Sequence, residues 1–255
     1  MIRRPDRRTL LACGALAAAP VRAQGTMPPW APSRPLRLVI PFPPGGGNDI
    51  LGRLLAQRIG DRFGQPVVAE NRGGAGSNIV AEATARAASD GHTVMIAANT
   101  FVLNAHLYRS LPFDVRRDFA PVARVAVTPM VVAAGPKLAT ASLAGTVAWM
   151  RARPAGALNH GTAGLGTVTH LASELFDARL GTRMTQVHYR GTGPMITALI
   201  SGEIELAFTP LPSVEAQARD GRLRIIAVAS AERVAALPGV PTVAEAAGLP
   251  GFEAD

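Results

Sequence analysis

Four glycine-rich turns carry the residues of this chain that could do chemistry. They read PPGGGND, NRGGAGSN, GTAGLGT and RGTGP, and each stands between a strand-like run and a helix-like run. Such a turn lets several backbone N–H groups point at one guest, and the positive end of the following helix favours an anion. Any single turn could be a tight connection without a ligand. Four turns in corresponding places indicate a cleft of helix N-termini and small hydroxyls, which suits carboxylates.

The sequence patterns of several enzyme classes do not occur. A phosphate-binding loop needs a lysine after its glycines, but the single lysine, Lys137, lies far from any such pattern. Neither G-x-S-x-G nor H-E-x-x-H occurs, and the five histidines show no metal-ligand spacing. We therefore expect no catalytic residue, no metal and no cofactor. A serine triad assembled from distant residues stays open, because such triads have no fixed spacing.

The N-terminus predicts an exported protein. Residues 1–23 combine a basic start, a short apolar run and small residues before position 24, which is the order of a secretory signal peptide. The pair Arg7-Arg8 leaves twin-arginine export as an alternative route. The only cysteine, Cys13, falls in this segment, so disulfides and cysteine nucleophiles are excluded from the mature chain.

The composition of the mature chain limits the classes of partner that it could bind. Removing residues 1–23 lowers the formal net charge from +8 to about +4. Arg116-Arg117 is then the only adjacent basic pair, so we expect no nucleic-acid partner. No segment has eighteen uninterrupted apolar residues, and we expect a soluble protein.

Strand-like and helix-like segments alternate from Arg34 onward. Strands are expected in LRLVIPF, PVVAEN, HTVMIAA, ALNHG, TQVHYR, IELAFTP and RIIAVAS, and helices near Asp49, Ser77, Leu103, Ser142, Thr167, Pro194 and Ser213. Apolar residues at every fourth position from Leu51 to Phe63 predict the buried face of the first helix.

This alternation predicts α/β architecture with mostly parallel strands. The β-prone run at 121–135 could carry the chain from one sheet to another, which favours two lobes. We expect a proline-rich arm at 24–33, a first lobe at 34–127 plus 232–255, and a second lobe at 128–231. The cleft between the lobes would be the natural ligand site.

Long motifs along the chain resemble one family. PFPPGGGND, AENRGGAGSNIVAEATARAASDGHT, LPFDVRRDFAPVARV, NHGTAGLGTVTHLASELF, VHYRGTGPMITALISGEIELAF and ALPGVPTVAEAAGLPGFE resemble, in this order, the substrate-binding proteins of tripartite tricarboxylate transporters, the Bug-type extracytoplasmic solute receptors. Membership implies a type II periplasmic binding-protein fold, in which two α/β lobes joined by crossover strands close on a small carboxylate. It also implies a monomeric periplasmic receptor that serves membrane permease subunits, without a cofactor.

The resemblance also implies ligand-binding residues in the first half of the chain. They are Pro44, Gly45, Gly46, Gly47, Asn48, Asp49, Ser77, Asn78 and Thr100. Asn48 stands where the family often has a small residue, serine or threonine. Asp49 has a second interpretation as the N-cap of the first helix, which we favour over a direct ligand contact.

The second half supplies the family's carboxylate-gripping segment, GTAGLGTVTH, and the turn RGTGP. The residues carried over are Thr162, Ala163, Gly164, Gly166, Thr167, His170, Tyr189, Arg190, Gly191, Thr192 and Thr209. His170 could be a ligand neighbour or a packing histidine, and we favour Arg190 as a rim charge. Many relatives carry aspartate at the position of Thr209, so its absence argues against an amino-acid ligand.

Two alternatives stay open beside transport. A receptor of the same fold could present its closed form to a membrane histidine kinase, and a secreted α/β enzyme could use the cleft for catalysis. The family usually continues beyond GLPGFEAD through a further strand and helices, so we expect part of the first lobe to be missing from this chain. The residues do not identify the ligand.

Overall fold

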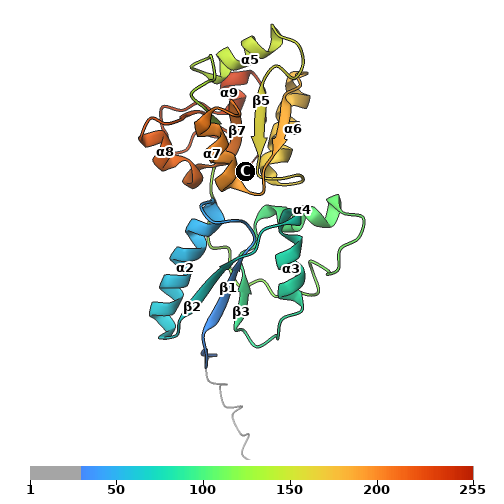
Figure 1. Ribbon diagram of the computed structural model, residues 1–255, viewed down its shortest axis with the longest axis vertical. Coiled ribbons are helices and arrows are strands. Elements are labelled where there is room, and N and C mark those ends of the chain that lie inside the picture. Colours follow the sequence, from blue (N-terminus) through green and yellow to red (C-terminus); the bar gives the residue numbers. More distant parts are fainter. Residues whose placement is uncertain (1–29, 255) are drawn as a thin grey trace, which may run out of the picture. The chain divides into compact units, whose positions relative to one another are not determined.

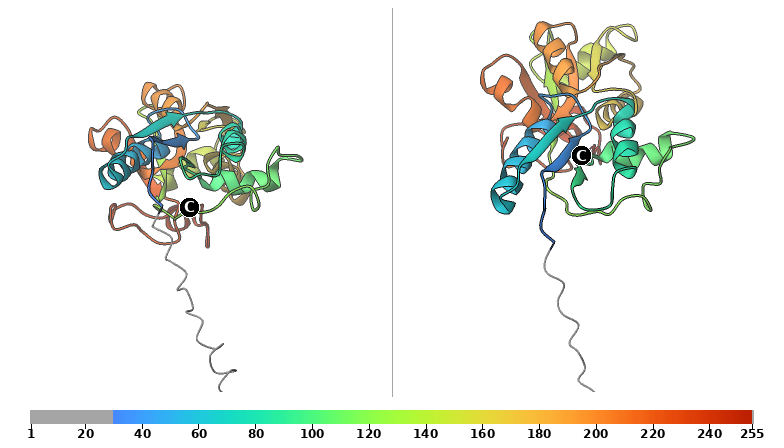
Figure 2. Two further views of the ribbon diagram at one scale, coloured as in Figure 1. Left: turned by 90° about the horizontal axis from the view of Figure 1, so that it is seen from below. Right: turned by 60° about the horizontal axis from the view of Figure 1, so that its bottom comes forward.

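The computed structural model describes residues 30–254, so the predicted signal peptide lies outside the described residues. A first sheet contains β1 (Leu36–Ile40), β2 (Val67–Asn71) and β3 (Thr93–Met95). Its order is β2-β1-β3, and both pairings are parallel, as expected from the alternation. The connecting helices are α2 (Gly47–Phe63), η2 (Ala75–Ser77), α3 (Asn78–Ala85) and α4 (Asn99–Leu107). Figures 1 and 2 show α2 and α3 on opposite sides of this sheet.

The buried face of α2 differs from the expected one. The residues spaced by four from Leu51 are only half-buried, and Phe63 is 44% exposed. Gly52 and Ala56 are buried instead. A Cβ on Gly52 would lie 2.6 Å from Cδ1 of Ile40, so the helix packs closely on β1 through small residues. A search for large apolar residues overlooks such a face.

The second sheet is mixed. It contains β4 (Met130–Ala134), β5 (Asn159–Thr162), β6 (Thr185–His188), β7 (Leu206–Pro210) and β8 (Arg224–Val228) in the order β6-β5-β7-β4-β8. Strand β4 is antiparallel to both of its neighbours, whereas β5 is parallel to β6 and β7. Its helices are α5 (Leu143–Arg151), α6 (Val168–Leu180), α7 (Thr192–Ser201), η3 (Leu211–Ser213), α8 (Glu215–Arg219) and α9 (Val243–Ala247).

Strand β4 separates two hydrophobic clusters, and all five of its residues are buried. Alternate residues point to opposite faces of a strand. Met130 and Val132 accordingly join a cluster with residues of α5, α6 and α9, and Val131 joins the cluster beneath α7. Figure 1 shows α6 and α7 on opposite sides of β7. Only the last part of the predicted β-prone run at 121–135 therefore forms a strand.

The C-terminal residues pack differently from the expected division into lobes. We expected 232–255 to join the first lobe. Val243, Leu249 and Phe252 lie instead in the cluster that contains β4, α5 and α6. Helix α9, which the strand and helix pattern did not predict, begins at Val243 after a capping box at its N-cap Thr242, and it contacts α5 and β8. We propose that 232–254 belongs to the second lobe.

The capping box of α9 gives a stability prediction. Thr242 Oγ1 accepts the Glu245 N–H at 3.0 Å, and Glu245 Oε2 accepts the Thr242 N–H at 2.8 Å. Thr242→Ala is expected to lower the free energy of unfolding by about 1 kcal/mol, because it removes the cap. Urea denaturation measures this loss. Thr242→Ser keeps the oxygen and should recover most of the stability, and an equal loss in both variants would contradict the capping role.

Candidate functional site

Two of the four glycine turns lie against each other, and their glycines permit the close approach. A Cβ on Gly193 would lie 2.8 Å from the carbonyl oxygen of Pro44. A Cβ on Gly191 would lie 2.7 Å from Cδ of Pro43, and Gly191 has a φ of 138°. Glycine is thus required at these positions for contact between the loop before α2 and the turn before α7.

The same loop also faces the end of β7. Gly46 is the N-cap of α2, and a Cβ there would lie 3.4 Å from Cβ of Thr192. A Cβ on Gly47 would lie 3.3 Å from Oγ of Ser213. The sequence prediction missed Ser213 as a site residue, although it shares the signal of the others, a small hydroxyl that follows a strand.

Asp49 anchors the first loop from within α2. Its Oδ2 accepts the Gly45 N–H at 3.0 Å, and its Oδ1 accepts from Asn71 Nδ2 at 2.9 Å and lies 3.0 Å from Arg53 Nε. The favoured N-cap interpretation was wrong, because the helix begins at Gly47 and its N-cap is Gly46. Burial acts to raise the pKa of Asp49, but the hydrogen bonds from Gly45, Arg53 and Asn71 outweigh it and lower the pKa. The ionised carboxylate therefore fixes the shape of the loop.

Three buried hydroxyls near these segments have no hydrogen-bond partner among the described residues. They are Oγ of Ser77, Oγ1 of Thr209 and Oγ of Ser213, and each residue is at most 3% exposed. Buried polar groups are nearly always hydrogen-bonded, so each such exception needs an explanation. A polar ligand would explain these three hydroxyls, because its acceptor oxygens could take their hydrogen bonds.

Backbone strain accompanies the hydroxyl at the second turn. Ser77 has a φ of 78° and Ala75 a φ of 46°, both in the region that favours glycine. Ser77 precedes α3 as its N-cap, yet its side chain makes no capping bond. Strained residues of this kind persist where the surroundings hold them, and they cluster at binding sites.

The neighbours of Ser77 form a buried polar pair. Asn104 Nδ2 donates to Asn78 Oδ1 at 2.7 Å and to the Gly76 carbonyl at 2.6 Å. Thr100 is buried, and its Cγ2 would lie 3.6 Å from a Cβ on Gly76. Asn78 and Thr100 thus support the NRGGAGSN turn from inside the first lobe, while Asn48 is half-buried on the first turn of α2.

The predicted carboxylate-gripping segment bonds largely to itself. The Ala163 N–H donates to Thr169 Oγ1 at 2.8 Å, and the Gly164 N–H donates to Thr162 Oγ1 at 3.3 Å. Thr167 caps α6 and donates through its own Oγ1 to the Gly164 carbonyl at 2.6 Å. These bonds hold the loop at the N-terminus of α6, and they leave the N–H groups of Ala163 and Gly164 occupied.

Two histidines at this end of the second sheet, His160 and His170, have lowered pKa values. The Gly166 N–H donates to His170 Nδ1 at 3.2 Å, which places the ring proton on Nε2, 3.6 Å from Glu174 Oε1. Burial and then the nearby His188 lower the pKa of His170, against a smaller effect of Glu174. Burial also lowers the pKa of His160 to about 3, with lesser contributions from His170 and His188. His170 therefore positions the loop and supplies no cation for a carboxylate.

The side chain of Tyr189 bonds to a residue outside this arrangement of loops. The Tyr189 hydroxyl donates to Glu203 Oε1 at 2.7 Å, and burial followed by Glu203 raises the pKa of Tyr189 to about 12. Arg190 is exposed and makes no ion pair among the described residues, as a rim charge would. The structure thus brings together Pro44, Gly46, Gly47, Gly191 and Thr192 with Ser213, whereas Tyr189 contacts a different partner.

A cavity of about 500 Å³ opens between α4 and α6, but it has the wrong chemistry for a carboxylate. Its walls are mainly apolar and include Val102, Leu103, Leu171 and Leu175, with Glu253 at one side. None of the predicted ligand-binding residues lines it. Within residues 30–254 no group of three histidine or acidic side chains is placed to hold a metal, and no described helix is long and apolar enough to cross a membrane.

Comparison with known sequences decides the family. The family described as "Tripartite tricarboxylate transporter family receptor" matches residues 51–255. The chain belongs to this family. Protein BugT of Bordetella pertussis is 38% identical to it over 239 residues, which cover 93% of this chain and 71% of that protein. These findings confirm the resemblance of the motifs to the Bug-type receptors.

Solved structures of tripartite tricarboxylate receptors and related binding proteins share the fold. An R. palustris protein solved with adipate superposes with a TM-score of 0.83 at 36% identity, over 87% of this chain and 74% of that one. MatC from Rhodopseudomonas palustris, solved with malate, gives a TM-score of 0.80 at 31% identity, over 87% and 75%. The periplasmic binding protein BugD gives 0.82 at 30% identity, over 87% and 74%. The expected two-lobed periplasmic binding-protein fold is therefore confirmed.

Proposed function

We propose that this chain is an exported receptor that binds a small organic acid between its two lobes and delivers it to a tripartite tricarboxylate-type permease. The family supports a solute-binding role. Adipate and malate, which the two solved relatives hold, are dicarboxylates, and their binding supports a carboxylate as the ligand class here. Closure of two lobes around a ligand is the usual motion of such receptors.

One observation carries the ligand class, namely the partnerless buried hydroxyls of Ser77, Thr209 and Ser213. A carboxylate has two acceptor oxygens and can take hydrogen bonds from several hydroxyls at once. Hydrogen bonds to an ionised group are shorter and stronger than neutral ones. The nearby N-termini of α2 and α7 add the favourable end of the helix dipole.

The same geometry argues against catalysis as the main activity. Acid–base chemistry needs titratable groups at hydrogen-bond distance from the reacting atoms. Asp49 is bound to Gly45, Asn71 and Arg53, and His170 is bound to Gly166. Both residues therefore hold loops in place.

A thermal-shift screen tests the proposed function directly. The purified mature protein is mixed separately with dicarboxylates, tricarboxylates, aromatic acids and amino acids. A specific acid should raise the melting temperature, because a ligand that binds only the folded state stabilises it by mass action. A well-folded protein that no carboxylate stabilises would overturn the proposal, and recovery of the bound acid unchanged would separate binding from turnover.

Ser213 offers a prediction with a matched control. Ser213→Ala is expected to weaken binding of the acid about tenfold, because one charge-assisted hydrogen bond is lost. The unliganded stability should stay unchanged, since this hydroxyl bonds to no group of the described residues. The matched control is Thr84→Val, which removes another hydroxyl without a hydrogen-bond partner among the described residues. Thr84 lies near the C-terminal end of α3, whereas the candidate site residue Ser77 lies at its N-terminal end, so this change should leave the affinity for the acid unchanged. Isothermal titration calorimetry measures both affinities, and equal values for Ser213→Ala and the wild type would remove Ser213 from the site.

A further inference from the structure

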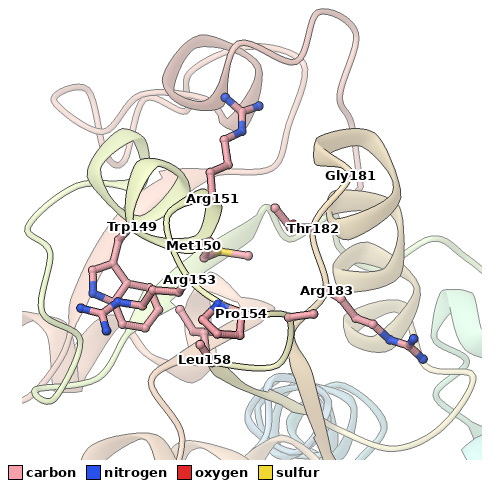
Figure 3. A pocket seen from close by; sticks show the side chains of 11 residues that line it. Trp149, Met150, Arg151, Arg153, Pro154, Leu158, Gly181, Thr182 and Arg183 are labelled. Atoms are coloured by element: carbon pink, nitrogen blue, oxygen red, sulfur yellow. The ribbon is translucent and has the colours of Figure 1, made fainter.

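A hollow of about 270 Å³ lies between the C-terminal ends of α5 and α6 in the second lobe (Figure 3). Its lining comes from the end of α5, the following turn at 152–158 and the loop after α6. The glycine segment GTAGLGT stands at the opposite end of α6, a helix of 13 residues and therefore about 20 Å long. The hollow is thus separate from the proposed ligand site.

Three arginines surround this hollow, and no acidic residue lines it. Arg151, Arg153 and Arg183 are exposed, and within the described part of the chain none of them makes an ion pair. The guanidinium carbon of Arg153 lies 4.3 Å from the centre of the Trp149 ring. Figure 3 shows Arg151 and Arg183 extending away from the hollow in different directions. The charges therefore form a rim and do not converge on one small ion.

Buried apolar side chains form part of the lining of the hollow. Met150 and Leu158 are buried and contribute to the floor, while Pro154 forms one wall. Below the loop after α6, Asp177 accepts from Thr182 Oγ1 at 2.9 Å and from the Met184 N–H at 2.8 Å. Asp177 is buried and already bonded, so it holds this loop in shape, and it makes no ion pair with Arg183 among the described residues, although Arg183 is near enough to act to lower its pKa.

The helix dipole explains the position of only one of these arginines. Arg151 lies in the last turn of α5, where a basic residue interacts favourably with the helix dipole. Arg183 lies beyond the C-cap Gly181 of α6, outside the helix, and gains little from that effect. Three arginines without an ion pair among the described residues surround a hollow that is lined in part by apolar side chains. This is the composition of a docking site, since arginine and aromatic residues are enriched in interfaces.

We propose that this arginine-rimmed hollow docks an acidic segment of a membrane protein, with one apolar side chain of that segment in the hollow and its carboxylates on the arginines. The identity of the partner as a permease subunit rests on the proposed function. Arginine forms paired hydrogen bonds with carboxylates, and complementary charge raises the rate of association. A flat anionic membrane surface would use neither the hollow nor its apolar floor.

The test uses the full exported chain in cells that lack their own copy. Arg151→Glu combined with Arg183→Glu reverses the rim, and Arg58→Glu combined with Arg62→Glu is the matched control. Arg62 lies in the last turn of α2, as Arg151 does in α5. Both control arginines are exposed, and neither forms an ion pair with another residue in the range 30–254. Ala155, exposed in the hollow, is replaced by the photoreactive residue p-benzoylphenylalanine to capture the partner.

We expect the rim reversal to lower uptake of the stabilising acid about tenfold at limiting receptor, as lost charge complementarity slows docking. Its affinity for the acid should not change, and the control pair should support normal uptake. The photocrosslink should reach an acidic segment of a membrane protein and disappear in the rim reversal. Normal uptake by the rim reversal, with an unaltered crosslink, would overturn the docking site.

Two further outcomes separate this inference from its alternatives. A rim-dependent crosslink to a membrane protein without any receptor-dependent uptake would keep the docking site and reject delivery to a permease. Protein-free vesicles of phosphatidylethanolamine and phosphatidylglycerol provide the second outcome. If the wild-type receptor sediments with these vesicles and the rim reversal does not, the partner is a lipid surface and the proposed protein partner is wrong.

Discussion

Gly193→Ala is expected to weaken binding of the carboxylate about a hundredfold while leaving the fold intact. The new methyl group would lie 2.8 Å from the Pro44 carbonyl oxygen, a backbone atom that cannot move without its loop. Overpacking of this kind costs roughly 1–3 kcal/mol, which corresponds to about a fivefold to 150-fold change in Kd, and contact with a backbone atom favours the upper part of this range. The penalty falls on the form in which the two glycine turns touch. Calorimetric titration with the acid measures the loss.

The helix that contains Gly193 should not suffer from this change. Without a ligand the two lobes can open, which separates the turns and removes the penalty. Alanine is a better helix former than glycine by roughly 1 kcal/mol, so the melting temperature of the unliganded protein should hold or rise. Gly60→Ala is the control, because a Cβ there meets nothing closer than 3.4 Å in α2. Unchanged affinity in Gly193→Ala would mean that the contact between the turns does not persist in the bound form.

Asp49→Asn is expected to destabilise the protein by about 2 kcal/mol, because a buried acceptor is replaced by a donor. Both carboxylate oxygens of Asp49 accept hydrogen bonds, from Gly45 on one side and from Asn71 and Arg53 on the other. An asparagine has one acceptor oxygen, so its NH₂ group must face one of these donors. Urea denaturation gives the loss, and Asp61→Asn, an exposed change in the same helix, should have little effect. A loss as small as that of Asp61→Asn would show that the loop does not depend on this anchor.

The pH dependence of stability follows from the lowered pKa of Asp49. A carboxyl whose pKa is lower in the folded state stabilises the fold above its unfolded value, about 3.9, and loses this contribution as the pH falls through the folded value. The difference in unfolding free energy between wild type and Asp49→Asn should therefore be full at pH 7 and shrink as the pH falls below about 4. If this difference in unfolding free energy did not change with pH, the charge of Asp49 would make no contribution to stability, and the loss in Asp49→Asn would come from the changed hydrogen-bond geometry alone.

Sequence patterns predicted the strands well, because short β-branched runs between glycine and proline turns carry a strong local signal. They failed where packing decides. The face of α2 that packs on β1 uses Gly52 and Ala56, and a search for large apolar residues does not find it. Helix α9 is only five residues long, and its signal is a capping box in TVAE and not a periodic pattern. Its place on α5 depends on contacts between distant segments, which no local pattern contains.

The site was predictable in its parts but not in its pairing. Glycine turns and small hydroxyls were visible at Gly46, Thr192 and Thr209, yet their spacing does not show which turns touch. Gly193 was omitted because its role is steric and depends on Pro44, which lies far away in the sequence. Asp49 was assigned to the wrong task, since a carboxylate in the first turn of a helix can bond backward to a loop as well as cap.

The position of β4 in the middle of the second sheet has a consequence for folding. The strand enters this sheet between β7 and β8, which come much later in the chain. Pairing of such distant segments slows folding, because a long loop must close before any contact is gained. The second lobe therefore cannot be completed until β8 has been synthesised.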